Sequence, residues 1–189
     1  MDQDFRVVLK ERTRQHHARL DRSMSELDLS TASGLATFLQ IHALCFAELR
    51  VAVECDIRLQ RQLDDLIVSA RTDLATLGRE EPPRVVFKLG ALDPLAVEYV
   101  VEGSRLGTRV LKRRWQTSHD DRVRRASAYF SRPAVPNAWR DVCERLSDIP
   151  TEDVRAERVI VETCAIFDLF ETVAGAMKDN AMTEDLVLP

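Results

Sequence analysis

The chain has 189 residues, of which 45% are hydrophobic and 31% charged, and its formal net charge is -4. These values are ordinary for one soluble globular domain, and the net charge gives no reason to expect nucleic-acid binding. Only six glycines and seven prolines interrupt the chain, which favours long helices over short strands with tight turns. We expect an all-α, single-domain protein over residues 1–183, followed by a flexible tail at residues 184–189.

Helical periodicity predicts three helices in the first part of the chain. The first is expected over about residues 4–24, and the second after the Ser30–Thr31 pair, where either hydroxyl can cap free amides. A charged third helix is expected to end by Gly78. Its predicted buried stripe is Ile57, Leu59, Leu63, Leu66 and Ile67. Residues 80–83 form an exposed connector, and residues 84–92 are ambiguous between extended and helical structure.

A strong helix start follows at Asp93–Pro94, an acidic cap with proline at the first helical position. The resulting helix is expected to reach about Trp115. Residues 118–136 are polar, rich in arginine and broken by prolines. Two further helices are predicted, over about residues 137–146 and 152–177.

A histidine pair lies on the predicted first helix, in the segment Leu9–Asp21, LKERTRQHHARLD. At about 100° per residue, His16 lies nearer the centre of the apolar stripe and His17 at its edge. An edge position suits a ligand for a cofactor that enters from the rim, and one histidine can hold a heme iron from one side. Lys10 lies two turns before His17 and can meet an anionic group of that cofactor. Histidines that are partly buried and hydrogen-bonded remain the alternative.

The segment Tyr99–Leu111, YVVEGSRLGTRVL, is a helical pattern interrupted by Gly103 and Gly107. Each glycine inside a helix costs about 0.5–1 kcal/mol relative to alanine, so the pair needs an offsetting gain. One explanation is close helix packing through small residues, or a helix end at Gly103. The other is close approach of a flat ligand, with a kink that frees amides near Ser104 to bind a small molecule.

Together these segments resemble the biliverdin-producing heme oxygenase family, particularly its bacterial members. LKERTRQHHARLD is similar to the family's N-terminal helix, where a threonine precedes the proximal histidine by four residues. Thr13 and His17 fit this spacing, whereas His16 does not. YVVEGSRLGTRVL resembles the distal helix, whose glycines flank the oxygen-binding face, and FDLFETVA is similar to the closing helix with its phenylalanine-rich stripe. The similarity covers most of the chain in matching order.

The resemblance implies a heme oxygenase-like helical bundle with His17 as the proximal iron ligand. It implies that Gly103 and Gly107 let the distal helix lie close over the heme, and that Ser104 supports a distal water network. The other residues expected to contact the heme are Lys10, Thr13, Tyr99 and Arg140.

Lys10 and Arg140 are the expected partners of the two propionates, although Glu144, one turn after Arg140, would repel a propionate. Two residues depart from the family pattern. Thr108 replaces a small residue beside the later glycine, and Arg105 is a large cation that must point away or reach a propionate.

By resemblance, the activity is O2- and electron-dependent cleavage of heme to biliverdin, CO and ferrous iron, with heme as both cofactor and substrate. The chain has no flavin or nicotinamide fingerprint, so an external donor such as a ferredoxin or a reductase must supply the electrons. We interpret part of a basic cluster as its docking surface, and a solvated face is the alternative. The cluster comprises Arg109, Lys112, Arg113, Arg114, Arg122, Arg124 and Arg125.

Other classes of protein remain open. A non-catalytic heme-binding or sensing module on the same fold is consistent with Thr108 and Arg105. A thiaminase-like enzyme would need a catalytic cysteine with acidic partners, and no such motif is recognisable. A purely structural helical interaction protein is the third possibility.

The remaining signals indicate a cytoplasmic protein without a membrane partner. No apolar run approaches the roughly 20 residues needed to cross a bilayer, and Asp2 and Asp4 do not fit a signal peptide. We interpret His42 as a core-edge residue and His119 as a surface residue. The cysteines form no CxxC pair and are interpreted as buried free thiols. They are Cys45, Cys55, Cys143 and Cys164.

Overall fold

The computed structural model describes residues 3–53, 55–80 and 89–184, with the side chains of these residues except 106, 108, 109 and 179–184. Within these ranges every regular element is a helix, which confirms the predicted all-α class. The helices are α1 (Phe5–Ser25), α2 (Ala32–Ala52), α3 (Ile57–Thr76), α4 (Pro94–Gln116), α5 (Asp121–Arg125), α6 (Ala138–Ser147) and α7 (Val154–Glu184). Most of the connector expected at 80–83, and the expected tail beyond Glu184, lie outside the described residues.

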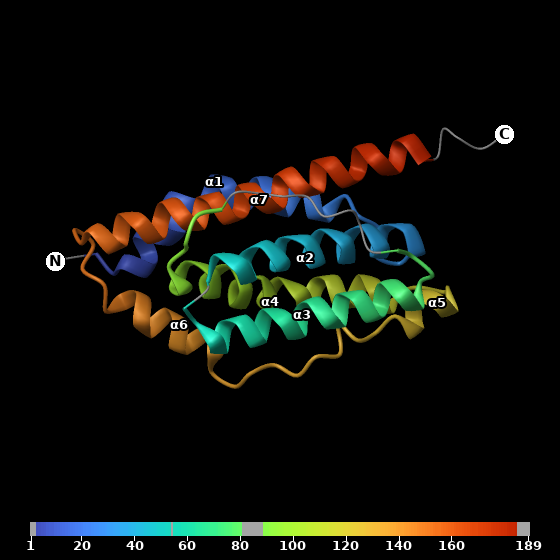
Figure 1. Ribbon diagram of the computed structural model, residues 1–189, viewed down its shortest axis with the longest axis horizontal. Helices are drawn as coiled ribbons and strands as arrows, with labels where there is room; N and C mark the ends of the chain where they lie inside the picture. The colour runs from blue at the N-terminus through green and yellow to red at the C-terminus, as the bar shows by residue number, and fades with distance from the viewer. Residues whose placement is uncertain (1–2, 54, 81–88, 185–189) are drawn as a thin grey trace.

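The long helices run roughly along the long axis of the molecule (Figure 1). α1 packs along α7, and α2 packs against both α3 and α7. α4 packs against α6 and α7. In contrast, α1 and α4 share almost no direct packing. The bundle therefore leaves room between these two helices.

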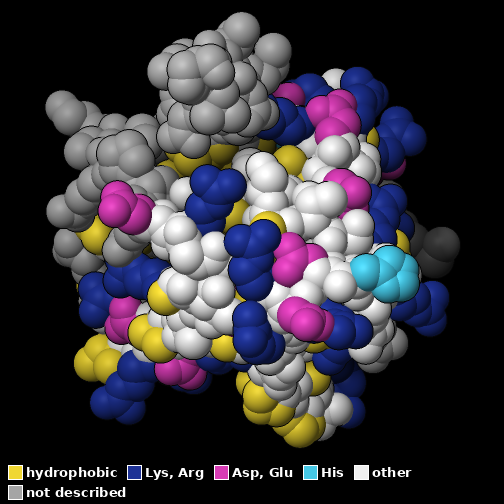
Figure 2. Space-filling model, turned by 90° about the vertical axis from the view of Figure 1, so that its right-hand side faces the viewer, with side chains coloured by type: hydrophobic (Ala, Val, Ile, Leu, Met, Phe, Trp, Pro, Cys, Tyr) yellow, Lys and Arg dark blue, Asp and Glu magenta, His cyan; other side chains and the backbone are white. Residues whose placement is uncertain are grey.

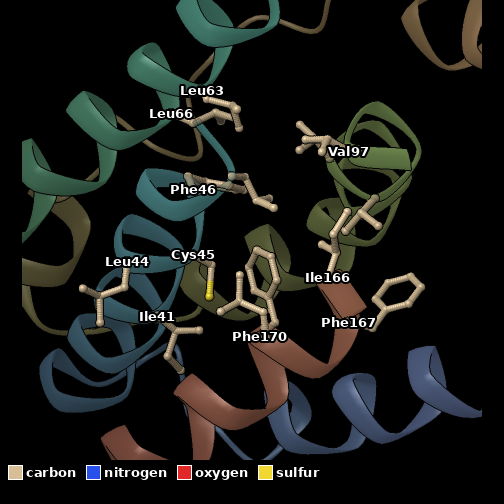
Figure 3. Packing of buried hydrophobic residues seen from close by; sticks show 14 of the residues in the cluster. Ile41, Leu44, Cys45, Phe46, Leu63, Leu66, Val97, Ile166, Phe167 and Phe170 are labelled. Atoms are coloured by element: carbon tan, nitrogen blue, oxygen red, sulfur yellow. The ribbon is translucent and has the colours of Figure 1, made fainter. Parts of the chain in front are cut away.

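α2 is the central core helix, and twelve of its residues are buried. Among the described helices it alone is long and apolar enough to cross a membrane, by length and composition only. Its most apolar stretch is 67% buried inside the protein, and a core helix passes the same test. Figure 3 shows Phe46 of α2 and Phe170 of α7 pointing into the space between their helices, whereas Phe167 projects from another side of α7.

The helix starts follow the predicted capping signals. Thr31 Oγ1 accepts a hydrogen bond from the backbone N–H of Gly34 at 3.1 Å, so Thr31 caps α2. Asp93 caps α4, and its carboxylate accepts from the N–H of Leu95 at 3.0 Å. These caps are local interactions, which is why sequence spacing alone located them.

Four details differ from the sequence expectations. α7 extends to Glu184, beyond the expected helix end near residue 177 and into the first residue of the expected tail. Ile57 is 64% exposed because it is the first residue of α3, whereas the other four residues of the predicted stripe are buried. Cys55 is exposed and Cys164 half-buried, so only Cys45 and Cys143 are buried free thiols. The short helix α5 was not predicted.

A buried carboxylate holds the segment that follows α5. Asp73 of α3 accepts hydrogen bonds from the backbone N–H groups of Ala128 and Tyr129, both at 2.8 Å. Burial raises the pKa of Asp73. This attachment places the rings of Tyr129 and Phe130 against Phe38 of α2. The segment thereby supports the inner side of the cavity described next.

Candidate functional site

A cavity of about 770 Å³ lies between α1 and α4. This volume falls within the range of small-molecule sites, roughly 300–1,000 Å³. Residues of α1, α2, α4, α6 and α7 form its walls. Seven of the eight predicted site residues line this one cavity: Lys10, Thr13, His17, Tyr99, Gly103, Ser104 and Gly107. Only Arg140 lies elsewhere.

Of the neighbouring histidines, His17 lines the cavity and His16 does not. His16 Nδ1 lies 2.7 Å from Asp168 Oδ1 of α7. Arg19 Nη2 donates to the same oxygen at 2.8 Å. The centre of the α1 stripe therefore faces α7, so the residue that periodicity placed most centrally binds the neighbouring helix.

The His17 ring lies between a carboxylate and an aromatic side chain. Its Nδ1 lies 3.0 Å from Asp21 Oδ2, and its ring meets that of Phe167 edge-on, with 5.3 Å between the ring centres. Among the described residues no hydrogen-bond or ion-pair partner lies at Nε2. Metal-bound histidines commonly have a carboxylate near their other ring nitrogen.

Thr13 and Tyr99 connect the two walls. Thr13 is 2% exposed, and its hydroxyl donates to the carbonyl of Leu9 at 2.8 Å. Burial raises the pKa of Tyr99, and a hydrogen bond to Thr13 opposes this shift. Ser104 donates to the carbonyl of Val101 at 2.8 Å.

The opposite wall, on α4, is bare where Gly107 lies. α4 continues through both glycines, so the helix end at Gly103 that the sequence left open is absent. A Cβ added at Gly107 would meet no atom within 4 Å, so helix packing does not require a glycine there. A Cβ at Gly103 would lie 3.4 Å from the Trp139 ring, at the tight end of ordinary contact. Trp139 was not predicted as a site residue.

The inner end of the cavity contains a histidine that the sequence analysis assigned to the core edge. His42 is 8% exposed and lines the cavity together with Phe38, Phe46 and Phe170. Its Nδ1–H donates to the carbonyl of Phe38 at 2.8 Å, so its Nε2 atom is an acceptor. Burial lowers the pKa of His42 to about 4, which keeps the ring neutral near neutral pH.

The outer end of the cavity is exposed and mainly basic. Lys10, Arg14 and Arg114 line it. Arg14 pairs with Glu11 at 3.2 Å, and Arg114 donates to a backbone carbonyl at 3.2 Å. Among the described residues no carboxylate pairs with Lys10, so its charge is available to an anionic ligand.

Arg140 lines a second cavity of about 310 Å³. Its Nε lies 3.4 Å from Glu144 Oε1, one turn along α6. The acid expected to repel a ligand therefore pairs with Arg140 itself. Arg105 also lines this second cavity, where its guanidinium donates to the carbonyl of Pro133 at 2.7 Å. The sequence analysis required Arg105 either to point away from the site or to reach a propionate. Its side chain points away from the larger cavity.

The described residues contain no cluster of three or more histidine, cysteine, aspartate or glutamate side chains that could hold a metal ion. A lone imidazole does not retain a bare ion, because protein metal sites use three or four ligands. His17 can therefore fix a metal only where another molecule supplies the remaining ligands.

Comparison of the chain with known protein families, with curated proteins and with solved structures finds no match. The site is thus defined by its own geometry: a large apolar cavity between two helices, with an imidazole on one wall and bare backbone on the other.

Proposed function

We propose that this protein binds heme between α1 and α4, with His17 as the iron ligand, and cleaves it as a heme oxygenase. The observation that carries the proposal is that His17 and Gly107 line the same cavity of about 770 Å³, with open space beside Gly107. A flat macrocycle would lie between an imidazole and the part of α4 where Gly103 and Gly107 present no side chains. The macrocycle also supplies the metal ligands that the protein lacks near His17.

The cavity has the polarity that heme requires. Its inner walls are aromatic, while Lys10, Arg14 and Arg114 line the exposed end. The two propionates of heme lie on one edge, so they would meet these cations while the apolar body enters the bundle. Lys10 takes the role that the family resemblance implied. Arg140 does not reach this cavity, so Arg14 and Arg114 replace it in the proposal.

Heme would be both cofactor and substrate, and its iron would bind and activate O2. The residues of the chain would hold the reacting edge and exclude bulk water. On the α4 wall, Gly103 and Gly107 let the backbone approach, while Tyr99 and Ser104 supply hydroxyl groups for hydrogen bonding. The products would be biliverdin, CO and ferrous iron.

Electrons would come from an external donor that docks on the protein surface. Figure 2 shows acidic side chains interspersed among the basic ones at the end of the molecule that carries α5. Arg122 pairs with Asp120 at 3.3 Å, and Arg124 pairs with Asp121. The predicted basic cluster is thus partly neutralised around α5. We therefore assign the docking of an acidic ferredoxin or reductase to its exposed α4 part, around Arg113.

The test is a hemin titration of the wild-type protein, His17→Ala and His16→Ala. We expect only His17→Ala to lose the histidine–iron absorption spectrum. Adding O2 and an electron donor to the loaded protein should then produce bilin absorption. A stable heme spectrum without bilin would instead support the non-catalytic heme-binding module, and loss of the spectrum in His16→Ala alone would contradict the ligand assignment.

A further inference from the structure

His42 gives the inner end of the cavity a hydrogen-bond acceptor with no partner. The ring cannot rotate freely, because Nδ1–H is bound to the Phe38 carbonyl at 2.8 Å. It also contacts the rings of Phe38, Phe46 and Phe170. Among the described residues no group donates to Nε2. Nε2 is not among the fully buried side-chain atoms, so a ligand or a water in the cavity can donate to it.

The charge distribution of the cavity sets which edge of a ligand meets His42. The cations Lys10, Arg14 and Arg114 line the exposed end, and His42 lies among buried side chains. A macrocycle with both carboxylates on one edge therefore binds with that edge outward. The opposite edge then lies at the inner end.

We propose that His42 Nε2 accepts a hydrogen bond from a hydroxyl group on the edge of the macrocycle opposite its carboxylates. This inference rests on the proposed function. The hydroxyl is either a substituent already present or one introduced by oxidation. In the oxidation, one atom of O2 enters a methine C–H bond and the other leaves as water, balanced by two electrons from the external donor and two protons. His42 would favour the inner methine position, because Nε2 is the hydrogen-bond acceptor at that end of the cavity.

A matched pair of ligands tests the acceptor without catalysis. Hematohemin carries hydroxyethyl groups where mesohemin carries ethyl groups, and both retain the two propionates. We expect the ratio of their dissociation constants, mesohemin over hematohemin, to fall about tenfold in His42→Leu. His42→Gln, which retains an acceptor, should restore part of the preference. Phe46→Leu alters the same inner end without removing an acceptor and should leave the ratio unchanged.

The outcomes separate the two proposals. If both macrocycles bind with a His17-dependent spectrum and the ratio is the same in His42→Leu, the role of His42 is overturned and the proposed function stands. If neither macrocycle binds to the wild-type protein, heme binding fails and this inference fails with it. In the active protein, a second expected result is a mixture of bilin isomers from His42→Leu where the wild type yields one.

Discussion

The two ends of the large cavity differ in composition and in their relation to the fold. The outer end carries exposed, polar residues such as Lys10 and His17, which contribute little to the packed core. The inner end is built from Phe38, His42 and Phe170, which are themselves part of that core. Substitutions at the outer end should therefore change ligand binding alone, whereas those at the inner end should change the stability of the whole bundle.

The largest expected effect is at the inner end. Phe170 is 4% exposed and packs against His42 and Phe46. Phe170→Ala should lower the free energy of unfolding by about 3–5 kcal/mol, because it leaves a cavity in the core. Chemical denaturation monitored by circular dichroism measures this change. Val161→Ala is the control, since Val161 is 57% exposed on the same helix and should have little effect.

Low pH should also lower the stability of the protein, through His42 at the inner end of the cavity. The pKa of His42 is about 4 in the folded protein, against about 6.5 in the unfolded chain. Between these values the unfolded state binds more protons, so the free energy of unfolding should fall as the pH drops from about 6.5 to 4. The full loss is up to about 3 kcal/mol.

His42→Phe should remove this part of the acid sensitivity. Denaturation curves at a series of pH values would show it as a flatter dependence of stability on pH. His119→Gln, at an exposed position, should keep the wild-type dependence. An unchanged slope in His42→Phe would mean that another group controls the acid transition.

A substitution at Gly107 should change stability and ligand binding in opposite directions. Gly107→Ala should raise the stability of the ligand-free protein by about 0.5–1 kcal/mol, because the helix gains a better residue and its Cβ meets no atom. The same Cβ should weaken hemin binding about tenfold by occupying the ligand space. Gly175→Ala in α7 is matched, since its Cβ also meets no atom. It should give the stability gain without the loss of affinity.

The smallest expected effect is electrostatic and belongs to the outer end. Lys10→Ala should weaken hemin binding only a few-fold, about 0.5–1 kcal/mol, because the charge is exposed to solvent. The loss should shrink as salt is added. Arg6→Ala, which removes an exposed cation that does not line the cavity, should leave the affinity unchanged. An effect of Lys10→Ala that is independent of salt would argue against a direct charge contact.

The sequence predicted what depends on local spacing. Caps such as Thr31 and Asp93 mark helix starts because their partners lie within a few residues. The placement of His17 and Gly107 on one cavity also agrees with expectation, although that expectation came from family resemblance. Periodicity alone placed His16 nearer the centre of the apolar stripe of α1. The stripe does not reveal whether its centre faces a cavity or, as here, the neighbouring helix α7.

The missed residues depend on distant contacts. His42 lies on α2, which is buried around most of its circumference, so no periodicity separates a cavity-lining position from a core position. Trp139 reaches Gly103 only because α6 packs on α4. Arg140 was predicted at the site but lies at the second cavity, beside Glu144 of its own helix.

The weak packing between α1 and α4 has a consequence for motion. α1 is held mainly by α7, through interactions such as those of His16 and Arg19 with Asp168. A ligand bound in the cavity would contact both α1 and α4 and would therefore stabilise the side of α1 that α7 does not cover. Amide protons along α1 should therefore exchange fastest among the long helices in the empty protein and slow down when the gap is filled.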